Sequence, residues 1–510
     1  MEERTAAPAL ALPHAPDDRR ERALDILCSD ELEPIVELVA WSMGQDRFGV
    51  RAHDGCVIYG RVRDGHGWSY SIESVDGRNP LADQATGRFI GIDQLRASPY
   101  PDRRANSYPH AYDELAQIFD HRDAPDVYAV HTAAHNWEER GGNRGEHGSV
   151  DSVQSRAVFL AAGSGIRSLG EQDRSCRIID IAPTVLALLG ARPSGGVGPN
   201  GGPRADALLA RQDGEIIPEL IDPAASPPAH VVCVLIDGCN LDVARDLAAR
   251  GEAPSLARLI ATGSLFTHGA IASSPTVTLP NHTSAITGSQ PAHHGILHNA
   301  WRDRATGARI VTESPATWAF AMNNLSSDVE TLFAAVARSV PGARSAAINE
   351  PCDTGADFST FAHVRAGAMP AIDSAGSGIP HANAEHTAAD EGYSWCSMID
   401  HAAVNQFVQQ WSDGPPTFTW INFTLVDTAG HKGGPDSPIA RAAIHDTDAR
   451  LGELLATIDD SGKSGSTAIF VLSDHGMEDT NPAVKGDWQA ALDAAGIPVT
   501  DEQGFLYLTA

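Results

Sequence analysis

Aspartate and histidine residues follow three apolar segments of the sequence. Asp237 comes directly after the segment HVVCVLI. Asp427 follows TWINFTLV, with His431 four residues later, and the adjacent pair Asp474 and His475 follows TAIFVL and one serine. Open α/β sheets build their sites at the carboxyl ends of parallel strands, so these side chains are candidates for one site. A mixture of carboxylate oxygens and imidazole nitrogens suits zinc or a similar divalent ion.

A further histidine lies far from these segments. His147 stands in Gly145-Glu146-His147-Gly148, shortly before the apolar run AVFLAA. Each pattern alone has a simpler interpretation: an aspartate after a strand often caps a helix, an Asp/His pair four residues apart is often a surface interaction, and His-Gly is often a turn. The combination of all four favours a metal site.

A hydroxyl group that could act as a nucleophile lies in SPTVTLPNHTSAITG, residues 274–288. Thr278 stands two residues before Pro280, and proline at a first helical position begins a helix well. A helix ending at Gly288 would direct its amino terminus toward Thr278, where free N–H groups could hold a phosphoryl oxygen. Thr278 could instead be only a helix cap. An unactivated hydroxyl is a poor nucleophile, so the chemical interpretation depends on nearby metal ions.

The segments before these residues predict an α/β protein with a mostly parallel central sheet and helices on both faces. The predicted strands are Val127–His131, Ala157–Ala162, His230–Ile236, Thr417–Leu425 and Thr467–Leu472, and a hairpin is predicted over Cys56–Ser71. The predicted helices are Asp180–Leu189, Pro254–Thr262 and Ile439–Ile458, the first capped by Asp180 and ended by Gly190.

The 510-residue chain carries 66 acidic and 37 basic Lys and Arg residues, a formal charge of -29. That charge repels nucleic acids and anionic membranes, so we expect neither as a partner. An anionic substrate would need a metal to reverse the sign locally. Seven scattered cysteines without a C-x-x-C pair, an acidic amino terminus and the lack of an apolar run of membrane-spanning length predict a cytoplasmic protein. The oligomeric state is not indicated.

The motifs together resemble the alkaline phosphatase superfamily, and most closely its nucleotide pyrophosphatase/phosphodiesterase branch. The resemblance is carried by Asp237-Gly238, T-x-T-L-P-N-H from Thr276, P-x-x-H-G-I-x-x-N ending at Asn299, D-x-x-G-H from Asp427, S-D-H-G-M from Ser473, and His147-Gly148. It implies Thr278 as the nucleophile and Asn299 as a donor to a phosphoryl oxygen. It also implies two zinc ions, one held by Asp427, His431 and His147, the other by Asp237, Asp474 and His475, with the hydroxyl of Thr278 bridging toward it as a further metal ligand.

One feature departs from the family's order. The His-Gly ligand of the family comes after S-D-H-G-M, whereas here it lies near the amino terminus. The Gly- and Pro-rich segment PSGGVGPNGGP, residues 193–203, divides the chain into residues 1–215 and 229–510. The order indicates a circular permutation, in which residues 1–215 supply the family's carboxyl-terminal section of one catalytic domain. The alternative is a fusion of two broken remnants that binds no metal pair.

The resemblance implies a metal-dependent hydrolase of small anionic phosphodiester or nucleotide pyrophosphate-type substrates, acting through a phosphothreonine. Phosphonate and phosphomonoester hydrolysis are the alternatives within the superfamily, and a non-catalytic binding protein is the alternative of another class. A cap-like insertion over residues 301–416 would set specificity. We expect supporting or surface roles for four further histidines, His282, His293, His294 and His298, and a pocket role is a further candidate for His131, His135 and Glu146.

Overall fold

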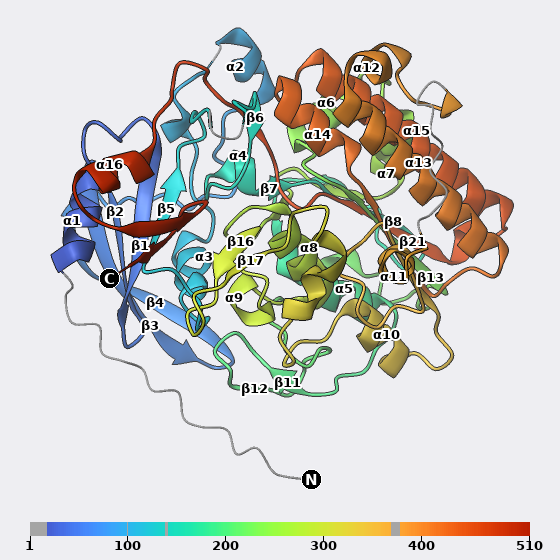
Figure 1. Ribbon diagram of the computed structural model, residues 1–510. Coiled ribbons are helices and arrows are strands. Elements are labelled where there is room, and N and C mark those ends of the chain that lie inside the picture. The colour runs from blue at the N-terminus through green and yellow to red at the C-terminus, as the bar shows by residue number, and fades with distance from the viewer. Residues whose placement is uncertain (1–17, 99, 138–140, 369–377, 510) are drawn as a thin grey trace.

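The computed structural model describes residues 18–98, 100–137, 141–368 and 378–509, which form two large β-sheets and four small ones with helices around them (Figure 1). The larger sheet has eight strands in the order β19-β18-β20-β13-β21-β8-β14-β9. Their bounds are β8 Phe159–Gly163, β9 Gly170–Gln172, β13 His230–Ile236, β14 Ser264–Phe266, β18 Ser345–Ile348, β19 Phe358–Ser359, β20 Phe418–Phe423 and β21 Thr467–Leu472. Strands from both sides of the Gly- and Pro-rich segment therefore share one sheet.

The eight-stranded sheet is mostly parallel. β18, β20, β13 and β21 run parallel to one another, whereas β8 is antiparallel to both β21 and β14. The central strand β13 alternates between two hydrophobic clusters, with Val232, Val234 and Ile236 on one face and the residues between them on the other. Both faces of the sheet are therefore buried, as helices on both sides require.

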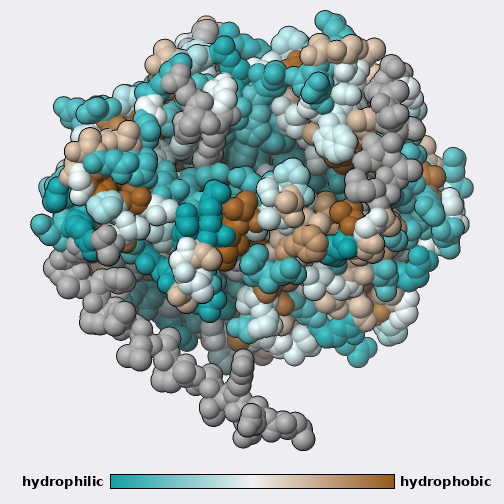
Figure 2. All heavy atoms as spheres, in the orientation of Figure 1, coloured by the Kyte–Doolittle hydropathy of each residue, from teal (hydrophilic) through white to brown (hydrophobic). Residues whose placement is uncertain are grey.

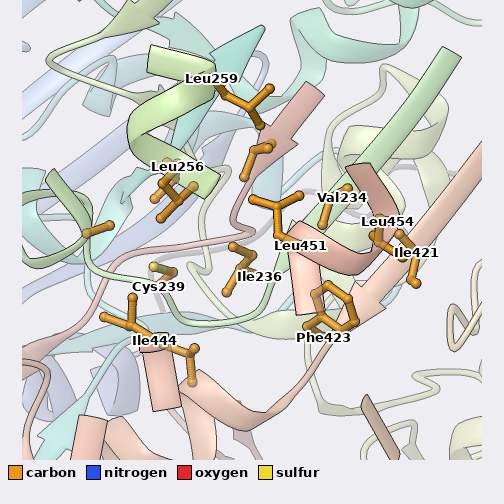
Figure 3. Packing of buried hydrophobic residues seen from close by; sticks show 14 of the residues in the cluster. Val234, Ile236, Cys239, Leu256, Leu259, Ile421, Phe423, Ile444, Leu451 and Leu454 are labelled. Atoms are coloured by element: carbon orange, nitrogen blue, oxygen red, sulfur yellow. The ribbon is translucent and has the colours of Figure 1, made fainter. Parts of the chain in front are cut away.

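Helices cover the two faces of this sheet (Figure 1). One face packs against α6 Leu241–Ala249, α7 Pro254–Thr262, α13 Glu391–Ser412, α14 Leu425–Gly433 and α15 Pro438–Asp460. The other face packs against α5 Ile181–Leu188, α8 Thr278–Thr287 and α10 Leu332–Ser339. Figure 3 shows part of the first cluster, where Leu451 of α15 lies near Ile236 of β13 and Leu454 of α15 lies near Ile421 of β20. Packing on both faces holds the strands β13, β20 and β21 in place, and the candidate site described below lies at their carboxyl ends.

The second sheet is antiparallel and has seven strands, in the order β23-β24-β5-β1-β2-β3-β4. Its strands are β1 Val36–Gly44, β2 Arg47–Ala52, β3 Gly55–Asp64, β4 Gly67–Gly77, β5 Val127–His131, β23 Val499–Glu502 and β24 Phe505–Leu508. The cluster on one face includes residues of α1 Asp18–Leu27 and α16 Trp488–Ala494, and the cluster on the other includes α3 Ala111–Ile118. The sequence did not indicate this sheet, and β5 belongs to it rather than to the central sheet.

The remaining elements are short. They are α2 Ile92–Ala97, α4 Ser152–Ser155, α9 Pro291–His294, α11 Thr360–Arg365, α12 Ala384–Ala389, β6 Gly145–Glu146, β7 Arg156–Ala157, β10 Cys176–Arg177, β11 Gly196–Val197, β12 Pro203–Arg204, β15 Ala270–Ile271, β16 Ala300–Arg302, β17 Arg309–Val311 and β22 Glu478–Asp479. Residues 301–416 contain β18 and β19, so part of that stretch belongs to the central sheet and not to a cap.

The predicted elements agree closely with the structure. β5, β13, β21 and α7 have the predicted bounds, and the predicted hairpin is β3 and β4. α8 ends at Gly288, which has a φ of 65°, but it begins at Thr278 rather than at Pro280. Asp180 does not cap α5 with its side chain, because its carboxylate accepts hydrogen bonds from the backbone N–H groups of Arg177 and Glu215 instead.

The two ends of the described chain lie side by side. An Nη1–H group of Arg19 in α1 donates to the carbonyl oxygen of Thr509 at 2.8 Å, and Arg22 donates to the carbonyl of Ala495. All seven cysteines are free thiols. On the face shown in Figure 2 the described residues are mostly hydrophilic, and hydrophobic ones form small separate groups. Among the described helices, none has the length and apolarity needed to cross a lipid bilayer.

Candidate metal centre

Three neighbouring parallel strands deliver three aspartates to one edge of the central sheet. Asp237 follows β13, Asp427 lies in the first turn of α14 just after β20, and Asp474 follows β21. Because β20 and β21 both pair in parallel with β13, their carboxyl ends meet at the same edge. All three aspartates are at least four-fifths buried. The site predicted from the three apolar segments is therefore assembled.

His147 and His431, which come from opposite halves of the chain, meet at this edge of the sheet. Nε2 of His147 lies 3.2 Å from Nε2 of His431, and the His147 ring stacks on that of His475 with centroids 3.6 Å apart. His147 is brought there because β6 pairs antiparallel with β22, which follows the Ser-Asp-His-Gly-Met segment. The structure thus gathers all six predicted metal ligands.

The three histidine rings share one orientation. Nδ1 of His147 lies 2.9 Å from the carbonyl oxygen of Thr276, Nδ1 of His431 lies 2.8 Å from that of Gly145, and Nδ1 of His475 lies 3.0 Å from that of Gly476. A carbonyl oxygen only accepts, so each Nδ1 carries the hydrogen and each Nε2 remains for a metal ion. Anchoring of the distal ring nitrogen in this way is typical of metal-binding histidines.

The ligand atoms fall into compact groups that could hold metal ions. Asp237, Asp474 and His475 form one group, and His147, Asp427 and His475 form another, with ligand atoms within 4.8 Å of one another in each. Asp427 is also within 3.5 Å of Nε2 of His431. A third group, Glu146, His147 and His431, adds a carboxylate that the sequence suggested only for a pocket.

Two buried carboxylate oxygens of these groups lack a hydrogen-bond partner among the described residues. They are Oδ1 of Asp237 and Oδ1 of Asp427. An unpaired buried carboxylate oxygen is costly unless a cation balances it. The residues present therefore fit a pair of divalent ions, one near Asp237, Asp474 and His475 and the other near Asp427, His431 and His147.

The ionisation of the aspartates reflects their crowding. Burial, with Asp474 close by, raises the pKa of Asp237 well above its ordinary value, and burial also raises the pKa of Asp427. Although burial opposes it, the charge and hydrogen bond of His475 lower the pKa of Asp474 to about 2. Without a metal ion, Asp474 is therefore the carboxylate that ionises most readily, whereas ionisation of Asp237 and Asp427 is disfavoured.

Thr278 stands beside this group, at the first position of α8. Its Oγ1 lies 3.4 Å from Nε2 of His475, and the residue is 9% exposed. The N-cap residue Val277 offers no side-chain cap, so the first-turn N–H groups of Thr278 and Leu279 have no partner within the helix. A hydroxyl and free N–H groups thus meet next to the carboxylates, as an oxyanion site requires.

Two glycines allow the strands and loops to approach this closely. Gly238 has a φ of 63°, and a Cβ there would lie 2.5 Å from Oδ1 of Asp427. At Gly430, a Cβ would lie 2.4 Å from the sulfur of Met477. Both positions belong to predicted motifs, and a larger residue at either would displace a metal ligand or its support.

A cavity of about 280 Å³ opens beside the metal groups. Its lining includes His147, His431, Val277, which directly precedes Thr278, and Asn299, whose Oδ1 has no hydrogen-bond partner among the described residues. Tyr128, His131, Trp137, Asn143, Glu146, Gly148, His298, Glu313 and Gln503 are also among the lining residues. Of the described residues in 301–416, Glu313 alone contributes to this lining, so most of the wall comes from segments that the sequence did not single out.

The additional histidines of the nucleophile region are buried rather than superficial. His282 is fully buried and its Nδ1 lies 2.9 Å from Oε2 of Glu350, itself fully buried. His294 contacts Ser284, and His293 lies between Asp120 and Asp213. The sequence does not single out Glu350, because the strand before it, β18, is a four-residue, alanine-rich segment without a clear strand pattern.

A family model describes the part of the chain that carries most of these residues. The model for type I phosphodiesterase / nucleotide pyrophosphatase matches residues 231–509, more than half of the chain. The chain belongs to this family, within the alkaline phosphatase superfamily. The matched residues include Asp237, Thr278, Asp427 and Asp474 but not His147, which completes the group from outside them.

Curated relatives are similar over part of their length. An uncharacterized pyrophosphatase/phosphodiesterase of Schizosaccharomyces pombe is 26% identical over 49% of this chain and 45% of its own. Ectonucleotide pyrophosphatase/phosphodiesterase family member 3 of Rattus norvegicus is 26% identical over 41% of this chain and 20% of its own. The chain thus spans less than half the length of these relatives.

Among solved structures, murine ectonucleotide pyrophosphatase/phosphodiesterase 5 shares 18% identity with a TM-score of 0.33, over 48% of this chain and 57% of its own. Phosphonoacetate hydrolase from Sinorhizobium meliloti shares 24% identity with a TM-score of 0.33, over 50% of this chain and 58% of its own.

Proposed function

We propose that the protein is a zinc-dependent phosphodiesterase that uses Thr278 as its nucleophile. The observation that carries the proposal is the convergence of three aspartates and three histidines, with unpaired carboxylate oxygens, on the hydroxyl of Thr278. The family of the chain supports hydrolysis of a phosphoester. Asp427, His431 and His147 would hold one ion, and Asp237, Asp474 and His475 the other.

The bound ions would supply positive charge for the phosphoryl oxygens and lower the pKa of a hydroxyl or water at the site. Thr278 Oγ attacks phosphorus, the bond from phosphorus to one ester oxygen breaks, and the proton of the threonine hydroxyl goes to the departing alcohol. The intermediate is a phosphothreonine that still carries the second ester group, and water hydrolyses it to a phosphomonoester and the free threonine hydroxyl. The first-turn N–H groups of α8 and the side-chain amide of Asn299 stabilise the negative charge that develops on the phosphoryl oxygens.

A diester is favoured by the space beside the nucleophile. The cavity of about 280 Å³ is lined by Asn299, Tyr128 and Trp137 among others, and it would give a second organic group room next to the phosphoryl group. We expect a small phosphodiester or nucleotide pyrophosphate-type substrate rather than a monoester. The site, with its cations in place, would attract that anion although the chain as a whole has a charge of -29.

The test is a comparison of rates at saturating zinc on bis-p-nitrophenyl phosphate, p-nitrophenyl phosphate and phosphonoacetate. Faster cleavage of the diester supports the proposal. Preference for the monoester or the phosphonate would retain the metal site and Thr278 but reassign the activity. Zinc binding without turnover of any of the three would favour a binding protein that keeps the fold.

We further propose that the chain is circularly permuted, with residues 1–215 supplying the family's carboxyl-terminal section. Two observations support this: the family model covers only residues 231–509, and His147 joins the metal group from outside them. The contact between Arg19 and Thr509 shows that the present ends are close enough to be joined. A chain rearranged to begin at residue 229 and end at 215, with a short linker from 509 to 18, should fold and bind zinc. A rearranged chain that folds but binds no zinc would contradict the permutation.

A further inference from the structure

His282 lies one helical turn after Thr278 and belongs to no metal group described above. Its ring is fully buried and is held by Glu350, whose Oε2 lies 2.9 Å from Nδ1. The other oxygen of Glu350 accepts a hydrogen bond from the backbone N–H of Cys352 at 2.7 Å. Because a carboxylate oxygen accepts, Nδ1 of His282 is the donor. Glu350 therefore fixes both the position and the orientation of the ring.

The opposite nitrogen of this ring faces two of the metal-binding carboxylates. Nε2 of His282 lies 3.7 Å from Oδ2 of Asp474 and 3.9 Å from Oδ2 of Asp237. Nε2 of His282 has no hydrogen-bond partner among the described residues. A buried polar atom aimed at two carboxylates without reaching either indicates an arrangement completed when those carboxylates hold a cation.

The neighbouring His294 shows what an ordinary buried histidine in this region looks like. It too is fully buried, but its Nε2 lies 3.1 Å from both the hydroxyl of Ser284 and the carbonyl oxygen of Pro280. Its Nδ1 lies 3.2 Å from the backbone N–H of Ile296. His294 therefore has its polar contacts with α8 and with the turn after α9, whereas His282 links Glu350 to the metal group.

We propose that His282, oriented by Glu350, is a positioning residue that holds Asp237 and Asp474 in the orientation in which they bind the second metal ion. It acts through those carboxylates and does not ligate the ion. The inference rests on the proposed function in one respect, the presence of two ions. The inference goes beyond the proposed function because it adds to the metal site a fully buried pair, His282 on α8 and Glu350 on the loop after β18. Loss of such outer contacts typically weakens metal binding by about 10- to 100-fold.

The experiment measures zinc affinity of the metal-free protein by competition with a chelator, without substrate. Two phases are expected, and a His431→Ala variant assigns the phase that belongs to the Asp427 group. In Glu350→Gln and in His282→Gln, the phase of the Asp237 group should weaken by about 10- to 100-fold, while the other phase stays unchanged. Saturating zinc should restore two ions per chain. His294→Gln is the matched control and should leave both phases unchanged.

Three results would overturn the inference. Unchanged affinity in both variants would exclude a role for the pair, and loss of one ion even at saturating zinc would make His282 a ligand. Equal weakening of both phases, together with lower thermal stability of the metal-free protein, would make the pair a purely structural contact. Wild-type protein that binds no zinc would refute the proposed function itself. Wild-type protein that binds two ions, beside variants of unchanged affinity, would refute this inference alone.

Discussion

Nε2 of His147 lies 3.2 Å from Nε2 of His431, although the two residues are 284 positions apart in the chain. The pairing of β6 with β22 and of β8 with β21 brings the two segments together. The metal centre is therefore a property of the whole chain and not of either half.

Thr278→Ala should remove turnover and retain the metal ions. The nucleophile is lost, whereas the three aspartates and three histidines of the metal groups all remain. Loss of a catalytic nucleophile lowers kcat by a factor of about 10³ or more. Kinetics and zinc analysis on the same preparation check this. Thr287→Val, which alters a buried threonine at the other end of α8, is the control and should keep its turnover. Comparable rates in Thr278→Ala and wild type would remove Thr278 from the mechanism.

His147→Ala should weaken binding of the ion held by Asp427 and His431, by more than about 100-fold, since a ligand contributes more than an outer contact. The measurement is a competition titration with a chelator. His135→Gln is the control, because His135 lies close to His147 in sequence but contacts the carbonyl of Gly486. Equal zinc affinity in His147→Ala and wild type would count against both the ligand assignment and the permutation.

Cleavage at the Gly- and Pro-rich segment should leave the two fragments associated. Ser194 and Gly195 are exposed, so a protease site inserted between them should be accessible. The fragments share the eight-stranded sheet through the pairing of β8 with β21 and β14. Size-exclusion chromatography after digestion should show one peak that contains both. Separation of the fragments without denaturant would contradict a single shared core.

The free energy of unfolding should depend on pH through His293. Burial alone would lower its pKa, but Asp213 at 2.5 Å and Asp120 at 3.1 Å raise it above the ordinary value. A raised pKa in the folded state means that this contribution is fully present below about pH 6.5, the unfolded value, and is lost as pH rises through the folded value. His293→Gln should therefore be destabilised by about 3 kcal/mol near pH 6, and by less near pH 9. Urea unfolding at several pH values checks this. A difference that grows with pH would contradict it.

The sequence allowed the parts of the site that follow strong strands to be predicted. β13 and β21 are continuous apolar runs, so Asp237, Asp474 and His475 could be placed at a sheet edge from the pattern alone. The His-Gly segment could be assigned only through resemblance, because β6 has two residues and no pattern of its own.

The antiparallel sheet and the cavity wall were not predicted, and the reason is physical. β5 has the same apolar pattern as a strand of the central sheet, and pairing partners are set by tertiary contacts that a local pattern does not contain. Its residues Tyr128 and His131 reach the cavity only because β5 lies in the other sheet. Glu350 follows a strand too short to recognise, so its contact with His282 appears only in three dimensions.

The most direct measurement is the initial rate of bis-p-nitrophenyl phosphate hydrolysis by the purified protein, before chelation, after chelation and after zinc is restored. The account predicts activity that is lost on chelation and returns as about two zinc ions per chain are rebound. Diester hydrolysis that persists in the metal-free protein, or zinc that rebinds without restoring it, would contradict the account.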